Sequence, residues 1–137
     1  MTLFVDTSVW SLAFRRDTPP EISETQALAR AISDGTQVMT TGLVLQEVLQ
    51  GMSGPKLRAS LIEKFSSLTF LIPDQTDHIE AADLRNTCRR AGVQVGTVDA
   101  LLAQLCIRHG LTMLAADRDF RFMARYTPLQ LWLPPLH

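Results

Sequence analysis

The chain has 137 residues, enough for one domain with a real hydrophobic core. Its hydrophobic fraction of 46% is ordinary for a soluble globular protein, and no apolar run reaches the roughly 18–20 residues of a membrane span. The net charge of −1 argues against wholesale electrostatic capture of nucleic acid. No basic lead-in precedes Asp6, so we expect a cytoplasmic protein without a secretory signal.

Short apolar segments alternate with amphipathic ones along the whole chain. In chain order we expect a strand at 3–6, a loop at 15–20, a helix at 21–35, a strand at 37–40, helices at 41–51 and 55–67, a strand at 68–72, helices at 76–90 and 97–109, a strand at 111–116, a helix at 117–125 and a strand at 129–133. Thr76 and Thr97 are the expected N-caps of their helices. This alternation predicts an α/β fold with a mainly parallel sheet covered on both faces, in one domain over residues 1–137.

Two acidic residues follow predicted strands. Asp6 ends the apolar run of the first strand, and Asp117 comes directly after "LTMLAA". Because the carboxyl ends of parallel strands lie at one edge of a sheet, both side chains would face one crevice if these strands are neighbours. Each residue is also a good helix N-cap, and for either one alone that interpretation stays open.

Two further acids lie on the apolar sides of predicted helices. Glu47 shares a helix face with Val44 and Val48 and has no Lys or Arg within one turn. A buried, unpaired carboxylate is costly, so Glu47 requires a partner from elsewhere in the fold, contact with water, or a metal ion. Asp99 shares a face with Leu102, although a first-turn Asp is also favoured by the helix dipole.

Together, Asp6, Glu47, Asp99 and Asp117 predict a metal site. Two carboxylates about 4 Å apart repel by about 4 kcal/mol even at an effective dielectric constant of about 20, so a cluster of four requires a cation. Ligation by oxygen alone selects Mg²⁺ or Mn²⁺, and the two Cys and three His residues lack the spacing of a zinc site. Such an ion orients water, assists its deprotonation and neutralises phosphate charge.

The segments "LFVDTSVW", "GLVLQEVLQG", "VDALLA" and "GLTMLAADRDF" occur in the order and spacing of the PIN domain. From residue 3 to about residue 132, the chain resembles the VapC-type toxin endoribonucleases of bacterial toxin–antitoxin pairs. The resemblance implies a three-layer α/β/α, Rossmann-like fold with a parallel sheet of four or five strands. It also implies cleavage of RNA that depends on Mg²⁺ or Mn²⁺, a small antitoxin protein as partner, and a homodimer.

The resemblance assigns roles to individual residues. Asp6, Glu47, Asp99 and Asp117 match the catalytic, metal-binding acids of the four motifs. Thr7 and Ser8 match hydroxyl positions that orient a carboxylate, and Asp119 matches the second acid of the last motif, expected at the rim of the site. The exposed helix face expected after Asp117 carries three arginines that we expect to hold RNA phosphates: Arg118, Arg121 and Arg125.

One position departs from the family pattern. The last motif usually reads Thr-x-Asp-x-Asp-Phe, and Ala115 stands here in place of the Thr. Loss of a hydroxyl that holds a ligand lowers metal affinity or activity by about 10–100-fold. A catalytically weak or inactive PIN-like module, acting by RNA or protein binding, is therefore the alternative to a nuclease. The intact set of four acids favours the nuclease.

Overall fold

The computed structural model describes residues 1–14 and 21–135, which form five strands and seven helices. The strands are β1 (Leu3–Val5), β2 (Val38–Thr41), β3 (Thr69–Leu71), β4 (Thr112–Leu114) and β5 (Gln130–Leu131). They form one sheet in the order β3-β2-β1-β4-β5, and every neighbouring pair is parallel. The predicted α/β class and parallel sheet are confirmed. The loop predicted at 15–20 lies outside the described residues.

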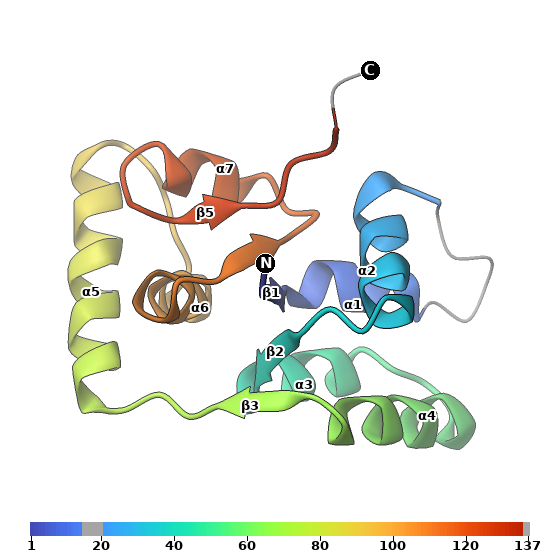
Figure 1. The fold of residues 1–137 in the computed structure, drawn as a ribbon. Coiled ribbons are helices and arrows are strands. Elements are labelled where there is room, and N and C mark those ends of the chain that lie inside the picture. Colours follow the sequence, from blue (N-terminus) through green and yellow to red (C-terminus); the bar gives the residue numbers. More distant parts are fainter. Residues whose placement is uncertain (15–20, 136–137) are drawn as a thin grey trace.

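Helices cover both faces of this sheet. They are α1 (Thr7–Ala13), α2 (Ser23–Ser33), α3 (Gly42–Gln50), α4 (Pro55–Ser66), α5 (Gln75–Arg90), α6 (Thr97–His109) and α7 (Asp119–Ala124). Crossovers between parallel strands are right-handed, so the chain changes face when it reverses direction between β3 and β4. Figure 1 shows the result, with α1 and α2 on one side of the sheet and α5 and α6 on the other. Within the described ranges, no helix is long and apolar enough to span a membrane.

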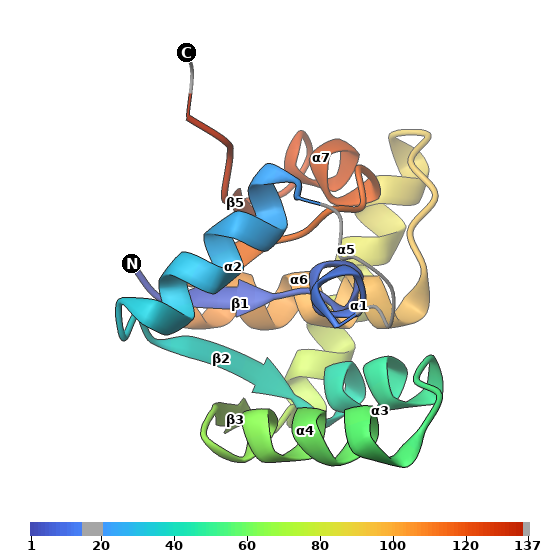
Figure 2. The ribbon, with the colours of Figure 1, turned by 90° about the vertical axis from the view of Figure 1, so that its right-hand side faces the viewer.

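Strand β1 is the central strand and the point where the topology reverses. It pairs with β2 on one side and β4 on the other, and its three residues are fully buried. The backbone N–H of Asp6 continues this ladder by donating to the carbonyl of Leu114 at 2.9 Å. Figure 2 shows β1 running directly into α1. Ligands of open α/β sheets bind at such a reversal point, beyond the carboxyl ends of the strands.

The core holds this edge of the sheet rigidly in place. Trp10 of α1 is completely buried, and its ring lies 4.6 Å from that of Phe65, centroid to centroid. On the opposite face, Leu102 and Leu105 of α6 are also completely buried. Burial of these large side chains against both faces of the sheet fixes the helices that carry the site, because such interiors are close-packed.

Four local details differ from the sequence predictions. No element was predicted for residues 7–13, which form α1. The predicted N-caps Thr76 and Thr97 are wrong: Asp74 caps α5, and Gly96 precedes α6 without a side-chain cap. Strand β4 ends at Leu114, so Asp117 does not follow it directly and two residues intervene. Short polar and small residues near an element's end offer several competing caps, which explains these shifts of one to three positions.

Candidate active site

Asp6 is buried at the end of β1, with 4% of its surface exposed. Its Oδ2 accepts hydrogen bonds from the Ser8 hydroxyl at 2.7 Å and from the Ser8 backbone N–H at 3.2 Å. Burial raises the pKa of Asp6, while the hydrogen bonds from Ser8 oppose this rise. Asp6 is thus the N-cap of α1, as the alternative interpretation held, and it also lies at the reversal point of the sheet.

Ser8 connects the ends of the two central strands. Its hydroxyl donates to Asp6 and accepts from the backbone N–H of Ala116 at 3.0 Å. The Asp6 carboxylate is therefore held relative to the segment that leads from β4 to Asp117. The sequence could not reveal this link, because the partner at Ala116 is a backbone group.

Glu47 is half-buried on α3 and is tied to α1. The Thr7 hydroxyl donates to Glu47 Oε1 at 2.9 Å, across 40 positions of sequence. No sequence signal connected these two residues, since nothing in a single sequence records which helices are neighbours. The bond holds Glu47 next to the residue that follows Asp6.

Asp99 is half-buried in the first turn of α6, and its pKa is raised from 3.8 to about 6. Burial is the largest cause, followed by repulsion from four other carboxylates: Asp6, Asp117, Glu47 and Asp119. Repulsion of this kind requires short separations, because exposed charges are screened over about 8–10 Å in salt solution. The structure therefore brings five acids from four separate segments into one region.

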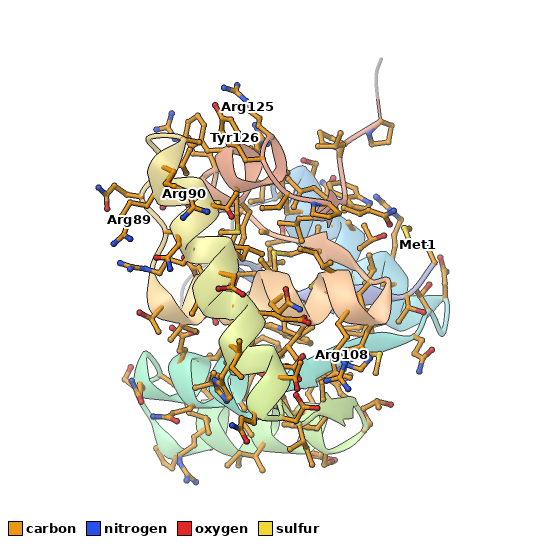
Figure 3. The ribbon with its side chains drawn as sticks, turned by 90° about the vertical axis from the view of Figure 1, so that its left-hand side faces the viewer. Met1, Arg89, Arg90, Arg108, Arg125 and Tyr126 are labelled. Atoms are coloured by element: carbon orange, nitrogen blue, oxygen red, sulfur yellow. The ribbon has the colours of Figure 1, made fainter. Side chains whose placement is uncertain are left out.

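Asp117 and Asp119 form the exposed rim of this cluster. The backbone N–H of Asp119 donates to Asp117 Oδ1 at 2.9 Å, which fixes the loop just before α7. Arg118, which lies between these two acids, and Arg121 and Arg125 of the following segment are exposed, and the guanidinium carbon of Arg125 lies 5.5 Å from the ring centroid of Phe122. Figure 3 shows Arg125 at the same end of the molecule as Arg89 and Arg90 of α5.

The chemistry of these side chains fits a hard divalent cation. In the described part of the chain, no set of three His, Cys, Asp or Glu residues is placed to enclose a metal ion directly. Mg²⁺ does not need such a cage, since it keeps several waters and binds proteins through one or two carboxylates. Among the described residues, the only ion pairs are those of Arg108 with Asp74 and Asp77, so no Lys or Arg of residues 1–14 and 21–135 pairs with an acid of the site.

Comparison with known proteins identifies the family. The family model described as "PIN domain" matches residues 3–126. The chain belongs to the PIN-domain family. Ribonuclease VapC11 from Mycobacterium tuberculosis is 30% identical over 130 residues, which cover 93% of this chain and 96% of that protein. VapC ribonuclease Mb1587 from Mycobacterium bovis has the same identity and coverage.

Solved PIN-domain structures share the fold at lower identity. VapBC2 from Rickettsia felis, bound to a DNA fragment from its promoter, superimposes with a TM-score of 0.74 at 18% identity, covering 96% of this chain and 98% of that chain. VapC20 from Mycobacterium tuberculosis, a toxin that cleaves the sarcin–ricin loop, gives a TM-score of 0.69 at 19% identity, covering 93% and 98%. The predicted three-layer fold is confirmed by these likenesses.

Proposed function

We propose that this PIN domain is an endoribonuclease that depends on Mg²⁺ or Mn²⁺ and acts as the toxin of a toxin–antitoxin pair. The observation that carries the proposal is the group of carboxylates around Asp99, which together with burial raises its pKa and, among the described residues, forms no ion pair with a Lys or Arg. Relatives named as ribonucleases cover nearly the whole chain, which supports RNA as the substrate. Asp6, Glu47, Asp99 and Asp117 are the proposed catalytic and metal-binding residues.

The chain's own residues would position the ligands and the RNA. When bound, the divalent ion supplies charge neutralisation and a water molecule that loses its proton more easily. Ser8 fixes the Asp6 carboxylate, and Thr7 fixes that of Glu47. Arg118, Arg121 and Arg125 would hold phosphates of the RNA, because guanidinium groups bind phosphate through two parallel hydrogen bonds. These contacts position the substrate without taking part in the chemistry.

Ala115 favours a second candidate, a PIN module that binds RNA or protein with little or no turnover. The position lacks the hydroxyl usual in the family. The Ser8 hydroxyl still holds Asp6, because it donates to the Asp6 carboxylate and accepts from the backbone N–H of Ala116. The sequence also keeps all four proposed ligands, Asp6, Glu47, Asp99 and Asp117. We therefore favour the nuclease, and expect Ala115 to affect its rate rather than its chemistry.

The proposal includes partners and a location. Several solved structures with this fold are complexes titled VapBC or FitAB, which supports a small antitoxin protein as partner of this chain. We further propose that residues 1–137 act as one domain, that the protein forms a homodimer, and that it works in the cytoplasm, where its RNA substrates lie. Light scattering of the purified protein tests the dimer.

The test is a cleavage assay with structured RNAs, in the presence of Mg²⁺, Mn²⁺ or a chelator. Wild-type protein should cut RNA only with a metal ion, and Asp6→Asn should abolish cutting because it removes one ligand charge while keeping the side chain's shape. Asp83→Asn, which changes an exposed acid on α5, is the control and should cut normally. Cutting by Asp6→Asn at the wild-type rate would refute the proposed mechanism. RNA binding without cutting by the wild type would favour the binding module.

A further inference from the structure

A cavity of about 430 Å³ is lined by residues of α3, α5 and α6. Its apolar wall includes Leu43, Val98 and Leu101, and its polar side includes Arg85 and Asn86. A concave site with an apolar wall and a few polar groups is the usual form of a site for a small, flat ligand group.

The walls of this cavity belong to two of the helices that carry the acids. Leu43 precedes Glu47 by one turn of α3, and these positions share a helix face. Val98 is the immediate neighbour of Asp99 in the first turn of α6. Residues of the cavity wall and of the acid cluster thus lie next to each other along α3 and α6, so an RNA chain bound at the acids would pass close to the cavity.

Arg85 is a positive charge fixed at the edge of this cavity. The side chain is half-buried, and its Nε donates to the backbone carbonyl of Val95 at 2.7 Å. Within the described residues, Arg85 forms no ion pair with a carboxylate. A guanidinium group that is anchored through Nε and lacks an acidic partner is suited to bind a phosphate with its remaining donors.

We propose that the cavity receives an unpaired nucleotide of the RNA next to the cleaved bond, with its base against the apolar wall and its phosphate on Arg85. This inference rests on the proposed function and makes it more specific, since it requires single-stranded RNA at the site. A folded-out base can enter such a cavity, whereas a base within a double helix is stacked and paired. Asn86 offers both a donor and an acceptor to the edge of that base.

Binding of a fluorescent single-stranded RNA, measured by anisotropy in the Asp6→Asn background, tests the inference without cleavage. Arg85→Gln should weaken binding by about tenfold, as expected for one charge-assisted hydrogen bond. It should also reduce the slope of log affinity against log salt by about 0.7, the value for one phosphate contact on a single strand. Arg58→Gln removes the same charge at an exposed position of α4. This control should change neither the RNA affinity nor its salt dependence.

A second variant leaves Arg85 itself in place. Ala82 lines the mouth of the cavity and is exposed, so Ala82→Glu should fold normally and repel the phosphate. It should weaken RNA binding at least as much as Arg85→Gln. Thermal melts and light scattering of each variant complete the test.

Equal RNA affinities for Arg85→Gln, Ala82→Glu and the Arg58→Gln control would overturn the inference. A lower molar mass for the Arg85 and Ala82 variants with unchanged RNA affinity would also overturn it, and would identify the cavity as a contact between two copies of the chain. Cleavage by the otherwise unchanged chain tests the nuclease activity separately. The cavity can therefore fail as an RNA site while the proposed function stands.

Discussion

Two groups of acids lie near the two ends of helix α6, and their electrostatic environments are opposite. Asp99 lies in its first turn among carboxylates, whereas Arg108 lies in its last turn beside Asp74 and Asp77. Arg108 lies nine positions after Asp99, about 14 Å along the helix axis. In Figure 3, Arg108 lies well away from the end of the molecule that carries Arg89 and Arg125.

The cluster at Arg108 is neutralised by its own side chains. Arg108 Nη1 lies 2.6 Å from Oδ2 of the fully buried Asp77 and 3.4 Å from Oδ2 of Asp74. Asp74 and Asp77 also form a reciprocal capping box at the start of α5. The hydrogen bond from the Asp77 backbone is the main reason that the pKa of Asp74 is lowered, with Arg108 contributing. At Asp99 the pKa is raised instead, so the acids at one end of the helix are stabilised by an arginine, whereas those at the other end repel one another.

The largest effect on stability should come from breaking the neutralised cluster. Arg108→Met keeps the aliphatic stem and leaves the buried Asp77 without its cation, which should lower the free energy of unfolding by about 2–3 kcal/mol. This loss is at or below the lower end of the range of about 3–5 kcal/mol for fully buried pairs, because 43% of the Arg108 side chain is exposed. Urea unfolding measures the change, with Arg58→Met as the control. A loss no larger than that of the control would mean that Arg108 does not stabilise Asp77.

A smaller effect is expected where a hydroxyl positions an acid in the other cluster. Ser8→Ala removes the group that holds Asp6 and Ala116 together, and should weaken Mn²⁺ binding by about tenfold. Titration calorimetry with Mn²⁺ measures the dissociation constant. Ser11→Ala, at an exposed position on α1, should bind Mn²⁺ like the wild type. Unchanged affinity in Ser8→Ala would show that this hydroxyl does not position a ligand.

The smallest expected effect is the change in folding stability with pH that Asp99 causes. Because the pKa of Asp99 in the folded protein is about 6, above its ordinary 3.8, the folded state binds the proton more tightly than the unfolded state. The carboxylate therefore reduces stability as the pH rises from 3.8 to about 6, and the full cost persists above that. With a chelator at pH 8, Asp99→Asn should be more stable than the wild type by about 1 kcal/mol, after allowance for its partial exposure.

Urea unfolding over a range of pH directly tests whether Asp99→Asn is more stable than the wild type. The advantage of Asp99→Asn should shrink as the pH falls through about 6 and vanish below 3.8. A variant less stable than the wild type at pH 8 would contradict the repulsion among the acids. For Asp74 the sign is opposite, because its lowered pKa adds stability that is lost as the pH falls.

The fold was predictable because its periodic elements carry strong signals. Buried strands such as β1 and β4 appear in sequence as short apolar runs, and their alternation with helices determines a parallel sheet. Helix α1 was not predicted, because its seven residues form only about two turns and its position depends on the cap at Asp6. Helix ends such as those near Thr76 depend on which of several polar residues caps the helix, which a sequence pattern does not determine.

The sequence indicated which acids to consider for the candidate site, but not how their side chains are arranged. The apolar surroundings of Asp6 and Glu47 were visible in the sequence, and so was the Arg-rich segment after Asp117. The bonds from Thr7 to Glu47 and from Ser8 to Ala116 depend on contacts between distant segments, one of them with a backbone group. The cavity lined by Arg85 and Val98 likewise forms only when α3, α5 and α6 pack together.

Thermal melts with and without Mg²⁺ test the central claim, that the acids around Asp99 form a metal site. Mg²⁺ at about a hundredfold excess over its dissociation constant should stabilise the wild type by about 2.7 kcal/mol through mass action. Asp6→Asn should be at least as stable as the wild type in a chelator, because one repelling charge is gone, and it should gain less from Mg²⁺. Asp83→Asn should gain as much as the wild type. Equal gains for the wild type and Asp6→Asn, or no gain for the wild type, would contradict the account.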